Sequence, residues 1–87
     1  MHGYAVTITD AATLLVDADN KNRSVYLHVV GNQAVALGGA AVTYATGLLT
    51  EKHTTPFELF VPLGEKVFAI CNTGTTEVVR VLVPNQD

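Results

Sequence analysis

The sequence predicts an all-β protein: a single small antiparallel β-sandwich, jelly-roll-like, or a barrel, of about eight short strands. Apolar residues recur with a period of two, most clearly over residues 23–30, where Val25, Leu27 and Val29 share one face. Residues typical of turns follow each such run at intervals of about 8–12 residues. No stretch has both the apolar spacing and the length of a convincing helix.

The first two strands are expected at residues 4–9 and 13–16, joined by a turn at 10–12. A helix over residues 10–16, with Asp10 as its N-cap, is the alternative, but it would be very short. Residues 17–22 are the most polar segment and begin like a calcium-binding loop. Lys21 occupies the third ligand position, however, and no glycine or distal glutamate completes the pattern. We therefore interpret this segment as a solvated turn.

The stretch from residue 23 to residue 48 organises the rest of the chain. It contains three apolar runs: residues 23–30, then residues 34–37 after a short turn at 31–33, then a third run with Val42 and Tyr44. The alanines of residues 34–45 also fit a helix. Gly38 and Gly39 disfavour that helix by about 2 kcal/mol, so a third strand is expected instead.

The last third of the chain predicts three more strands. Residues 47–56 are expected to cross from one sheet to the other, and residues 57–61 then form a strand. Residues 66–72 are almost continuously apolar, which indicates a strand buried on both faces, with Cys71 as a small buried hydrophobic residue. Residues 72–75 have the composition of a tight hairpin turn in which Gly74 adopts positive φ, and residues 76–83 form the final strand.

Size and composition predict one domain that covers residues 1–87, with a flexible N-terminal segment at 1–4 and a C-terminal tail at 84–87. A chain this short buries only about 60–65% of its unfolded surface. Because 48% of the residues are hydrophobic and 15% are charged, we expect some apolar surface to meet a second copy or a partner.

Several partners and compartments are not expected. The net charge is −3 and no basic patch is present, which argues against a nucleic-acid partner. The longest apolar region, about residues 25–49, is interrupted by polar residues and glycines, which argues against a membrane segment. The N-terminus lacks the features of a signal peptide, so synthesis in the cytoplasm without secretion is expected.

No catalytic, cofactor-binding or metal site is expected, and we predict that the protein is not an enzyme. His2, His28 and His53 lack a second ligand at i+2 or i+4, and Ser24, the only serine, has no recognisable partners. The sequence instead indicates an outward aromatic set on the strands, made up of Tyr26, His28, Tyr44 and Phe60. Such a set suits a partner protein or a sugar, or it lies in an oligomer that covers both faces of the strands.

The order of these features resembles a family of small β-sandwich modules in the structural proteins of tailed bacteriophages. The resemblance covers about residues 5–83 and is carried by residues 12–16, 19–23, 25–31, 34–39, 42–47, 66–71, 73–75 and 78–83. It implies a capsid decoration protein of the virion that binds the major capsid protein, stabilises the outer surface of the assembled head and forms a homotrimer. Because the sequence runs from Met1 to Asp87, a stand-alone decoration protein is expected over a segment of a fibre.

The alternative is a fibre-type receptor- or carbohydrate-binding module. For the decoration role the interface residues expected are His2, Tyr4, Tyr26 and Phe60. For the alternative, the exposed aromatic residues and the polar loops around Asp19 and His53 would bind sugars. The bacterial host cytoplasm is the expected site of synthesis.

Overall fold

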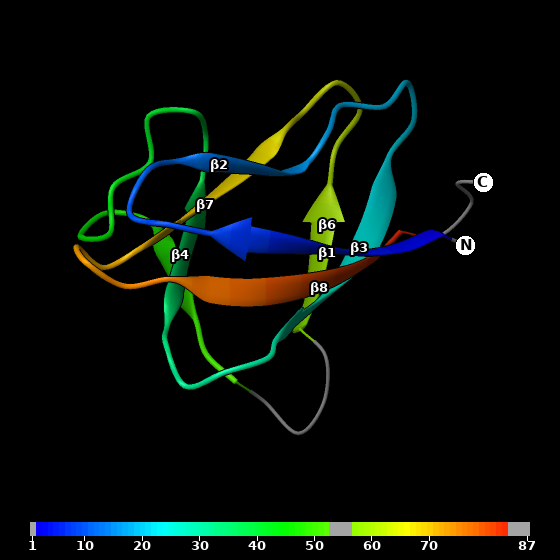
Figure 1. Cartoon of the computed structure of the whole chain (residues 1–87). Helices are drawn as coiled ribbons and strands as arrows, with labels where there is room; N and C mark the ends of the chain where they lie inside the picture. Colours follow the sequence, from blue (N-terminus) through cyan, green and yellow to red (C-terminus); the bar gives the residue numbers. More distant parts are fainter. Residues whose placement is uncertain (1, 53–56, 84–87) are drawn as a thin grey trace.

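The computed structural model describes residues 2–52 and 57–83 and consists of two four-stranded antiparallel sheets (Figure 1). The strands are β1 (His2–Ile8), β2 (Thr13–Val16), β3 (Arg23–Val29), β4 (Val35–Gly38), β5 (Leu48–Thr50), β6 (Phe57–Val61), β7 (Val67–Cys71) and β8 (Glu77–Val83). One sheet has the order β1-β8-β3-β6 and the other β2-β7-β4-β5. The prediction of an all-β sandwich is confirmed, and the two separate sheets exclude a closed barrel.

The chain passes from one sheet to the other at almost every connection, which is the winding of a jelly roll. Only β4 and β5 are both consecutive in sequence and paired with each other. The expected hairpin at residues 72–75 is therefore wrong, because that turn leads from β7 in one sheet to β8 in the other. Gly74 does adopt positive φ there, at 78°. The expected crossing between sheets before residue 57 is confirmed, since β5 and β6 lie in different sheets.

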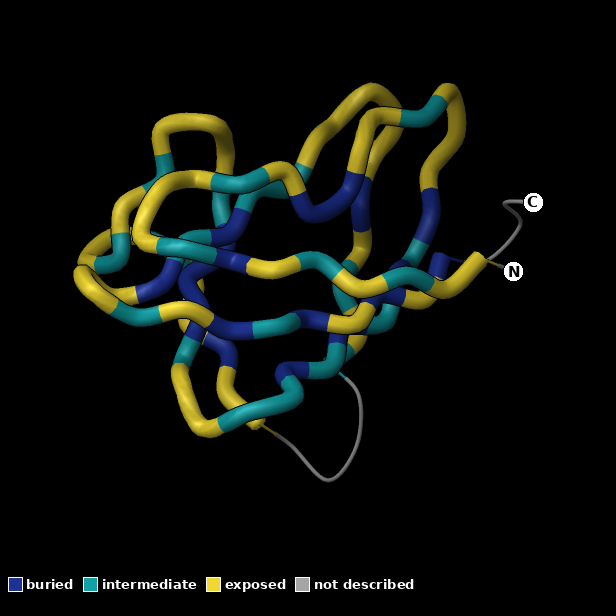
Figure 2. The backbone as a smooth tube through the Cα atoms, in the orientation of Figure 1, coloured by how far each residue is buried: buried dark blue, intermediate teal, exposed yellow. Residues whose placement is uncertain are grey.

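Alternating apolar residues of both sheets form the core between them (Figure 2). In β3 the residues Val25, Leu27 and Val29 are buried, while the side chains between them are half-buried. Cys71 is a buried free thiol, as expected, and burial raises its pKa. The expectation that residues 66–72 are buried on both faces is corrected. Ala69 and Cys71 are buried, but the residues between and before them are only half-buried.

The predicted third strand with Val42 and Tyr44 is absent, because residues 39–47 form turns. Hydrogen bonds from Val42 N to Gly39 O (3.0 Å) and from Gly47 N to Thr43 O (2.9 Å) close these turns. A Cβ at Gly47 would lie 2.7 Å from the Cβ of Ala36, so glycine allows the chain to fold back onto β4. Strand β5 begins directly afterwards, inside the segment that was expected to be only a connection.

The N-terminal strand is longer than expected. The sequence favoured a flexible segment at residues 1–4, but β1 begins at His2 and pairs with β8 from His2↔Val83 to Ile8↔Glu77. Residues 2–4 are therefore part of a sheet. Met1, His53 and the expected tail at residues 84–87 lie outside the described residues.

Candidate functional site

Side-chain alternation places a row of aromatic and charged residues on the outer face of the β1-β8-β3-β6 sheet. The inward direction of Val25, Leu27 and Val29 turns Tyr26 and His28 outward. Strand register then sets their neighbours: Tyr26 faces Leu82 and Glu58, His28 faces Arg80, and Ser24 faces Phe60. Tyr26, His28 and Phe60 thus share one face, as the sequence predicted.

Phe60 is the most exposed large hydrophobic residue of the described chain, at 60% exposure, and Leu48 follows at 58%. Both residues line a groove of about 360 Å³ at the β5–β6 side of the sandwich, which we call the β6 groove. Its apolar lining includes Leu48, Leu59, Phe60, Pro62 and Val67, and its charged members are Glu65 and Lys66. An exposed apolar groove with a small charged component is typical of a surface that binds another protein.

A second cavity of about 360 Å³, which we call the β1 cavity, lies at the opposite side of the sandwich, next to β1 and β2. His2, Tyr4, Val6, Val83 and residues 14–17 line it. The Tyr4 hydroxyl donates a 2.7 Å hydrogen bond to the Leu15 carbonyl oxygen, so this side chain bridges the two sheets. Burial raises the pKa of Tyr4, Arg23 acts in the opposite direction, and Asp17 adds to the increase.

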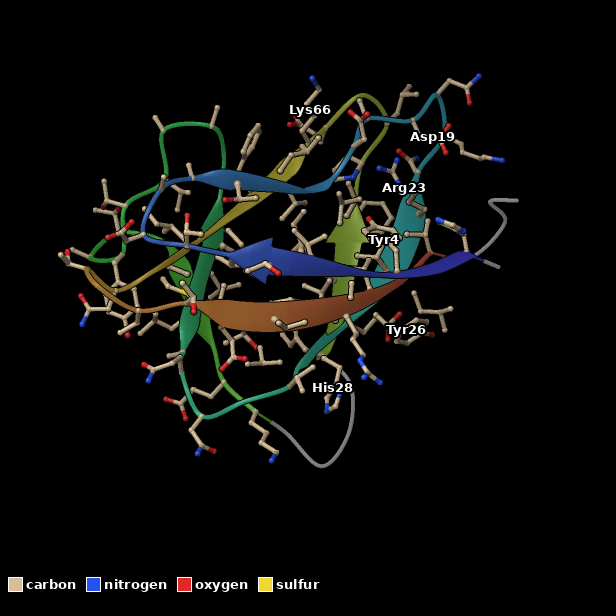
Figure 3. The ribbon with its side chains drawn as sticks, viewed as in Figure 1. Tyr4, Asp19, Arg23, Tyr26, His28 and Lys66 are labelled. Atoms are coloured by element: carbon tan, nitrogen blue, oxygen red, sulfur yellow. The ribbon has the colours of Figure 1, made fainter. Side chains whose placement is uncertain are left out.

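The four predicted interface residues therefore fall into two separate groups. His2 and Tyr4 line the β1 cavity with their ring centroids 5.4 Å apart, whereas Tyr26 and Phe60 lie on the outer face of the sheet. Figure 3 shows Tyr4 near Arg23, and Tyr26 and His28 on the lower side of the molecule. Of the four, His2 and Phe60 are exposed, while Tyr4 and Tyr26 are half-buried. Tyr44 lies in the turns of residues 39–47 and does not join the outer face.

Leu48, which lies in β5 and lines the β6 groove together with Phe60 of β6, was not identified from the sequence. It belongs to a leucine pair, Leu48 and Leu49, at the start of a connection that is otherwise polar, and both leucines are more than half exposed. Two adjacent exposed leucines in a polar segment were the available signal. The sequence pattern hides this signal, because the predicted third strand ends just before the two leucines and places them at the start of a connection.

The side chain of Arg23 organises the polar loop at residues 17–22. The guanidinium of Arg23, which is 6% exposed, donates hydrogen bonds to the carbonyl oxygens of Asp17 and Lys21. These are oxygens of the kind that a calcium loop would turn toward its cation. Across residues 2–52 and 57–83, no group of three or more His, Cys, Asp or Glu side chains could hold a metal ion.

The described part of the chain contains no helix that is long and apolar enough to span a membrane. No protein-family model matches this chain, and neither a curated protein nor a solved structure matches it.

Proposed function

We propose that this protein is a non-catalytic structural protein that binds other protein subunits through Phe60 and the β6 groove. The observation that carries the proposal is the exposure of Phe60 and Leu48, at 60% and 58%, around one apolar groove. A large aromatic residue at the mouth of an apolar pocket is the usual composition of an energetic centre in a protein interface. A chain with 48% hydrophobic residues gains from covering such a surface.

The specific form that we propose is a capsid decoration protein of a tailed bacteriophage, which binds the major capsid protein on the outside of the head. The support is the resemblance of residues 5–83 to phage β-sandwich modules. Jelly rolls also occur in lectins and cupins, so the fold is compatible with this role without selecting it. A protein that binds only the assembled lattice stabilises it by mass action, and a homotrimer would add avidity.

The substitution Phe60→Asp tests the binding surface. It places a charge at the centre of the proposed contact, and we expect self-association or head binding to weaken by at least about 2 kcal/mol, or roughly thirtyfold. Light scattering measures self-association, and co-sedimentation with phage heads measures binding. Circular dichroism checks that the variant is folded, which we expect because Phe60 lies outside the core.

Leu63→Asp is the matched control. Leu63 is 58% exposed and follows β6, but it does not line the β6 groove. We expect this variant to assemble and bind like the parent protein. The proposal for the β6 groove is wrong if Phe60→Asp binds normally, or if Leu63→Asp weakens binding to the same extent.

The copy number of the chain in purified particles of a phage that encodes it tests the decoration role. We expect a number comparable to that of the major capsid protein, measured by quantitative mass spectrometry. Absence from the particle would exclude a virion role, and a handful of copies would exclude decoration.

The second candidate is a fibre-type receptor- or carbohydrate-binding module, and the outer face of the sheet favours it. Tyr26 lies there between Leu82 and Glu58, and His28 lies beside Arg80. An aromatic ring next to charged hydrogen-bonding groups is a suitable platform for a sugar, since the ring packs and the charged groups orient the hydroxyls. A few copies per particle, together with a defined ligand on a glycan array that Tyr26→Ala abolishes, would support this function.

A further inference from the structure

The edge strands of the two sheets differ in how well they are protected from pairing with another chain. Exposed edges are commonly blocked by shortness, bulges, charges or prolines. Strand β2 has a register shift between Leu14 and Val16, and β5 has three residues followed by Glu51 and Lys52. Strand β6 carries Glu58 and is followed by Pro62. Strand β1 has none of these features: it has seven residues, an unbroken register with β8, and no Asp, Glu, Lys, Arg or Pro.

The register shows which backbone groups of β1 point to the open side. The hydrogen bond from Val30 N to Val78 O (3.0 Å) places Val78 among the residues of β8 whose backbone faces β3. Backbone direction alternates along a strand, so Val79 and Val81 face β1 instead. In β1, Val6 pairs with Val79 and Tyr4 pairs with Val81, so the backbone groups of Val6 and Tyr4 point toward β8. The alternate residues of β1 turn their N–H and C=O groups away from β8. These outward residues are Gly3, Ala5 and Thr7.

All three outward residues are exposed and have small side chains. Among the described residues, no loop or side chain forms a hydrogen bond with the backbone of Gly3, Ala5 or Thr7. With respect to residues 2–52 and 57–83, the β1 edge is therefore a regular row of unpaired backbone donors and acceptors.

Gly3 has no evident role within a single chain. Its φ is not positive, β1 has no bulge there, and a Cβ would approach no atom closer than 3.8 Å. A glycine inside a strand weakens the strand, and one common reason for its presence is the close approach of another backbone. The open side of β1 is the direction from which such a backbone would come.

We propose that β1 pairs antiparallel with β1 of a second copy of this chain, about a two-fold axis at Ala5. The three outward residues are symmetric about Ala5, so Ala5 faces Ala5 of the second copy and Gly3 faces its Thr7. Each facing pair exchanges both N–H···O bonds, and all the outward groups are satisfied. The contact is self-complementary, as a two-fold interface requires, and the strand carries no Asp, Glu, Lys or Arg that would be repelled by its copy.

The inner face of β1 also favours a second copy. In this register Tyr4 of one chain lies opposite Val6 of the other, so the apolar row of β1 continues across the axis. That row borders the β1 cavity, which Tyr4, Val6 and Leu14 help to line in each chain. Pairing therefore covers this cavity at the same time as it satisfies the edge. Strand β6 lies at the other edge of the same sheet, so the β6 groove stays free for a different partner.

The variant Ala5→Cys tests the axis. Facing residues in hydrogen-bonded antiparallel pairs have Cα atoms about 5.5 Å apart, which lies within the range of about 4.4–6.8 Å for disulfides. We expect mild oxidation to convert most of the protein into a covalent dimer, seen on a non-reducing gel. The native thiol, Cys71, is buried and does not compete.

Thr7→Cys is the matched control, on the same strand and the same face. Its two copies would lie roughly 14 Å apart in this register, too far for a disulfide, so only background cross-linking is expected. Combining Gly3→Cys with Thr7→Cys should restore cross-linking, because these two positions face each other across the axis. A folded Ala5→Cys protein that cross-links no more than Thr7→Cys overturns the inference.

Ala5→Pro tests the pairing without a cysteine. The N–H of Ala5 points to the open side, so its loss leaves the β1–β8 ladder intact and the fold is retained. We expect the dimer dissociation constant, from sedimentation at several concentrations, to rise at least about tenfold. Two results together would overturn the inference: the parent protein stays monomeric, and Ala5→Cys in assembled particles cross-links to a different protein. The β1 edge would then bind that other protein.

The inference does not depend on the proposed function. Phe60→Asp should leave the cross-linking of Ala5→Cys unchanged, because the two positions lie at opposite edges of the sheet. Loss of head binding with retained cross-linking, or the reverse, therefore identifies which of the two proposals has failed.

Discussion

Glu77 and Arg23 are buried charged side chains, each the first residue of its strand, and the structure satisfies them to different extents. Glu77 is 8% exposed and Arg23 is 6% exposed. The Glu77 carboxylate accepts hydrogen bonds from Gly31 N (2.9 Å), Gln33 N (3.0 Å) and Val78 N (2.8 Å). Arg23 donates to two loop carbonyls, and its Nε is buried without a hydrogen-bond partner.

The two side chains also differ in what they connect. Glu77 holds a crossing between the sheets that is more than 40 residues away in sequence, at residues 31–33. Arg23 binds carbonyls two and six residues away and organises only its own loop. The comparison indicates that Glu77 stabilises the tertiary fold, whereas Arg23 shapes one local segment.

Glu77→Gln should have the largest effect on stability. The amide has one acceptor oxygen instead of two, and its NH₂ group would face backbone N–H donors, so at least one donor loses its partner. We expect the free energy of unfolding to fall by about 2–3 kcal/mol in urea denaturation. Glu58→Gln, on an exposed position of β6, is the control and should stay within about 0.5 kcal/mol. Equal effects of the two substitutions would contradict the role of Glu77.

Gly31→Ala should have the next largest effect. A Cβ at this position would lie 2.6 and 2.7 Å from the two carboxylate oxygens of Glu77, so the carboxylate would have to move. We expect a loss of about 1–2 kcal/mol in the same denaturation experiment. In a Glu77→Ala background the additional loss should disappear, because the clash is gone. Simple additivity of the two changes would show that the clash is not its cause.

Acid should weaken the parent protein more than the Glu77→Gln variant. Burial acts to raise the pKa of Glu77, but the N–H groups of Val78, Gln33 and Gly31, together with Lys52, outweigh it, so the pKa is lowered. A carboxyl group whose pKa is lower in the folded state stabilises the fold above its unfolded pKa of about 4.3. This stabilisation is lost as the pH falls through the folded pKa. Chemical denaturation between neutral and acidic pH should show a steeper decline for the parent, and parallel curves would contradict this.

Arg23→Met should have the smallest effect. Methionine retains much of the apolar stem, removes the unpaired Nε from the interior, and leaves the carbonyls of Asp17 and Lys21 in a loop that water can reach. We expect the free energy of unfolding to change by less than about 1 kcal/mol. Cleavage by trypsin after Lys21 should become faster, because the loop loses its internal donors. A loss as large as that of Glu77→Gln would show that Arg23 is also a tertiary anchor.

The sequence predicted the strands better than it predicted the connections between them. The period of two placed Val25, Leu27 and Val29 in the core and Tyr26 and His28 outside it. The same alternation continues to Arg23, two residues before Val25, and predicts that this side chain also points inward. In β8, Glu77 likewise lies on the inward face with Val79, Val81 and Val83. Their burial was therefore visible as a pattern. What local sequence could not supply was the set of partners for Glu77, because Gly31 and Gln33 are distant in the chain.

The same distinction applies to the candidate site. Phe60 was identified because its strand is regular, and Leu48 was missed because its strand depends on how glycines at positions 38 and 47 let the chain fold back against Val42. The local composition of residues 40–47 fits a strand, and only contacts with β4 convert it into turns. The pairing of β4 with β5 within one sheet, not propensity, decided this region.

The pairing of the first strand with the last also determines when the protein can fold. Strand β1 forms its ladder with β8, so the first sheet cannot be completed until β8 has emerged from the ribosome. A topology dominated by contacts between distant residues folds slowly, on a scale of about milliseconds to seconds. Until β8 emerges, β1 lacks its partner in the sheet, which leaves it open to premature association between nascent chains.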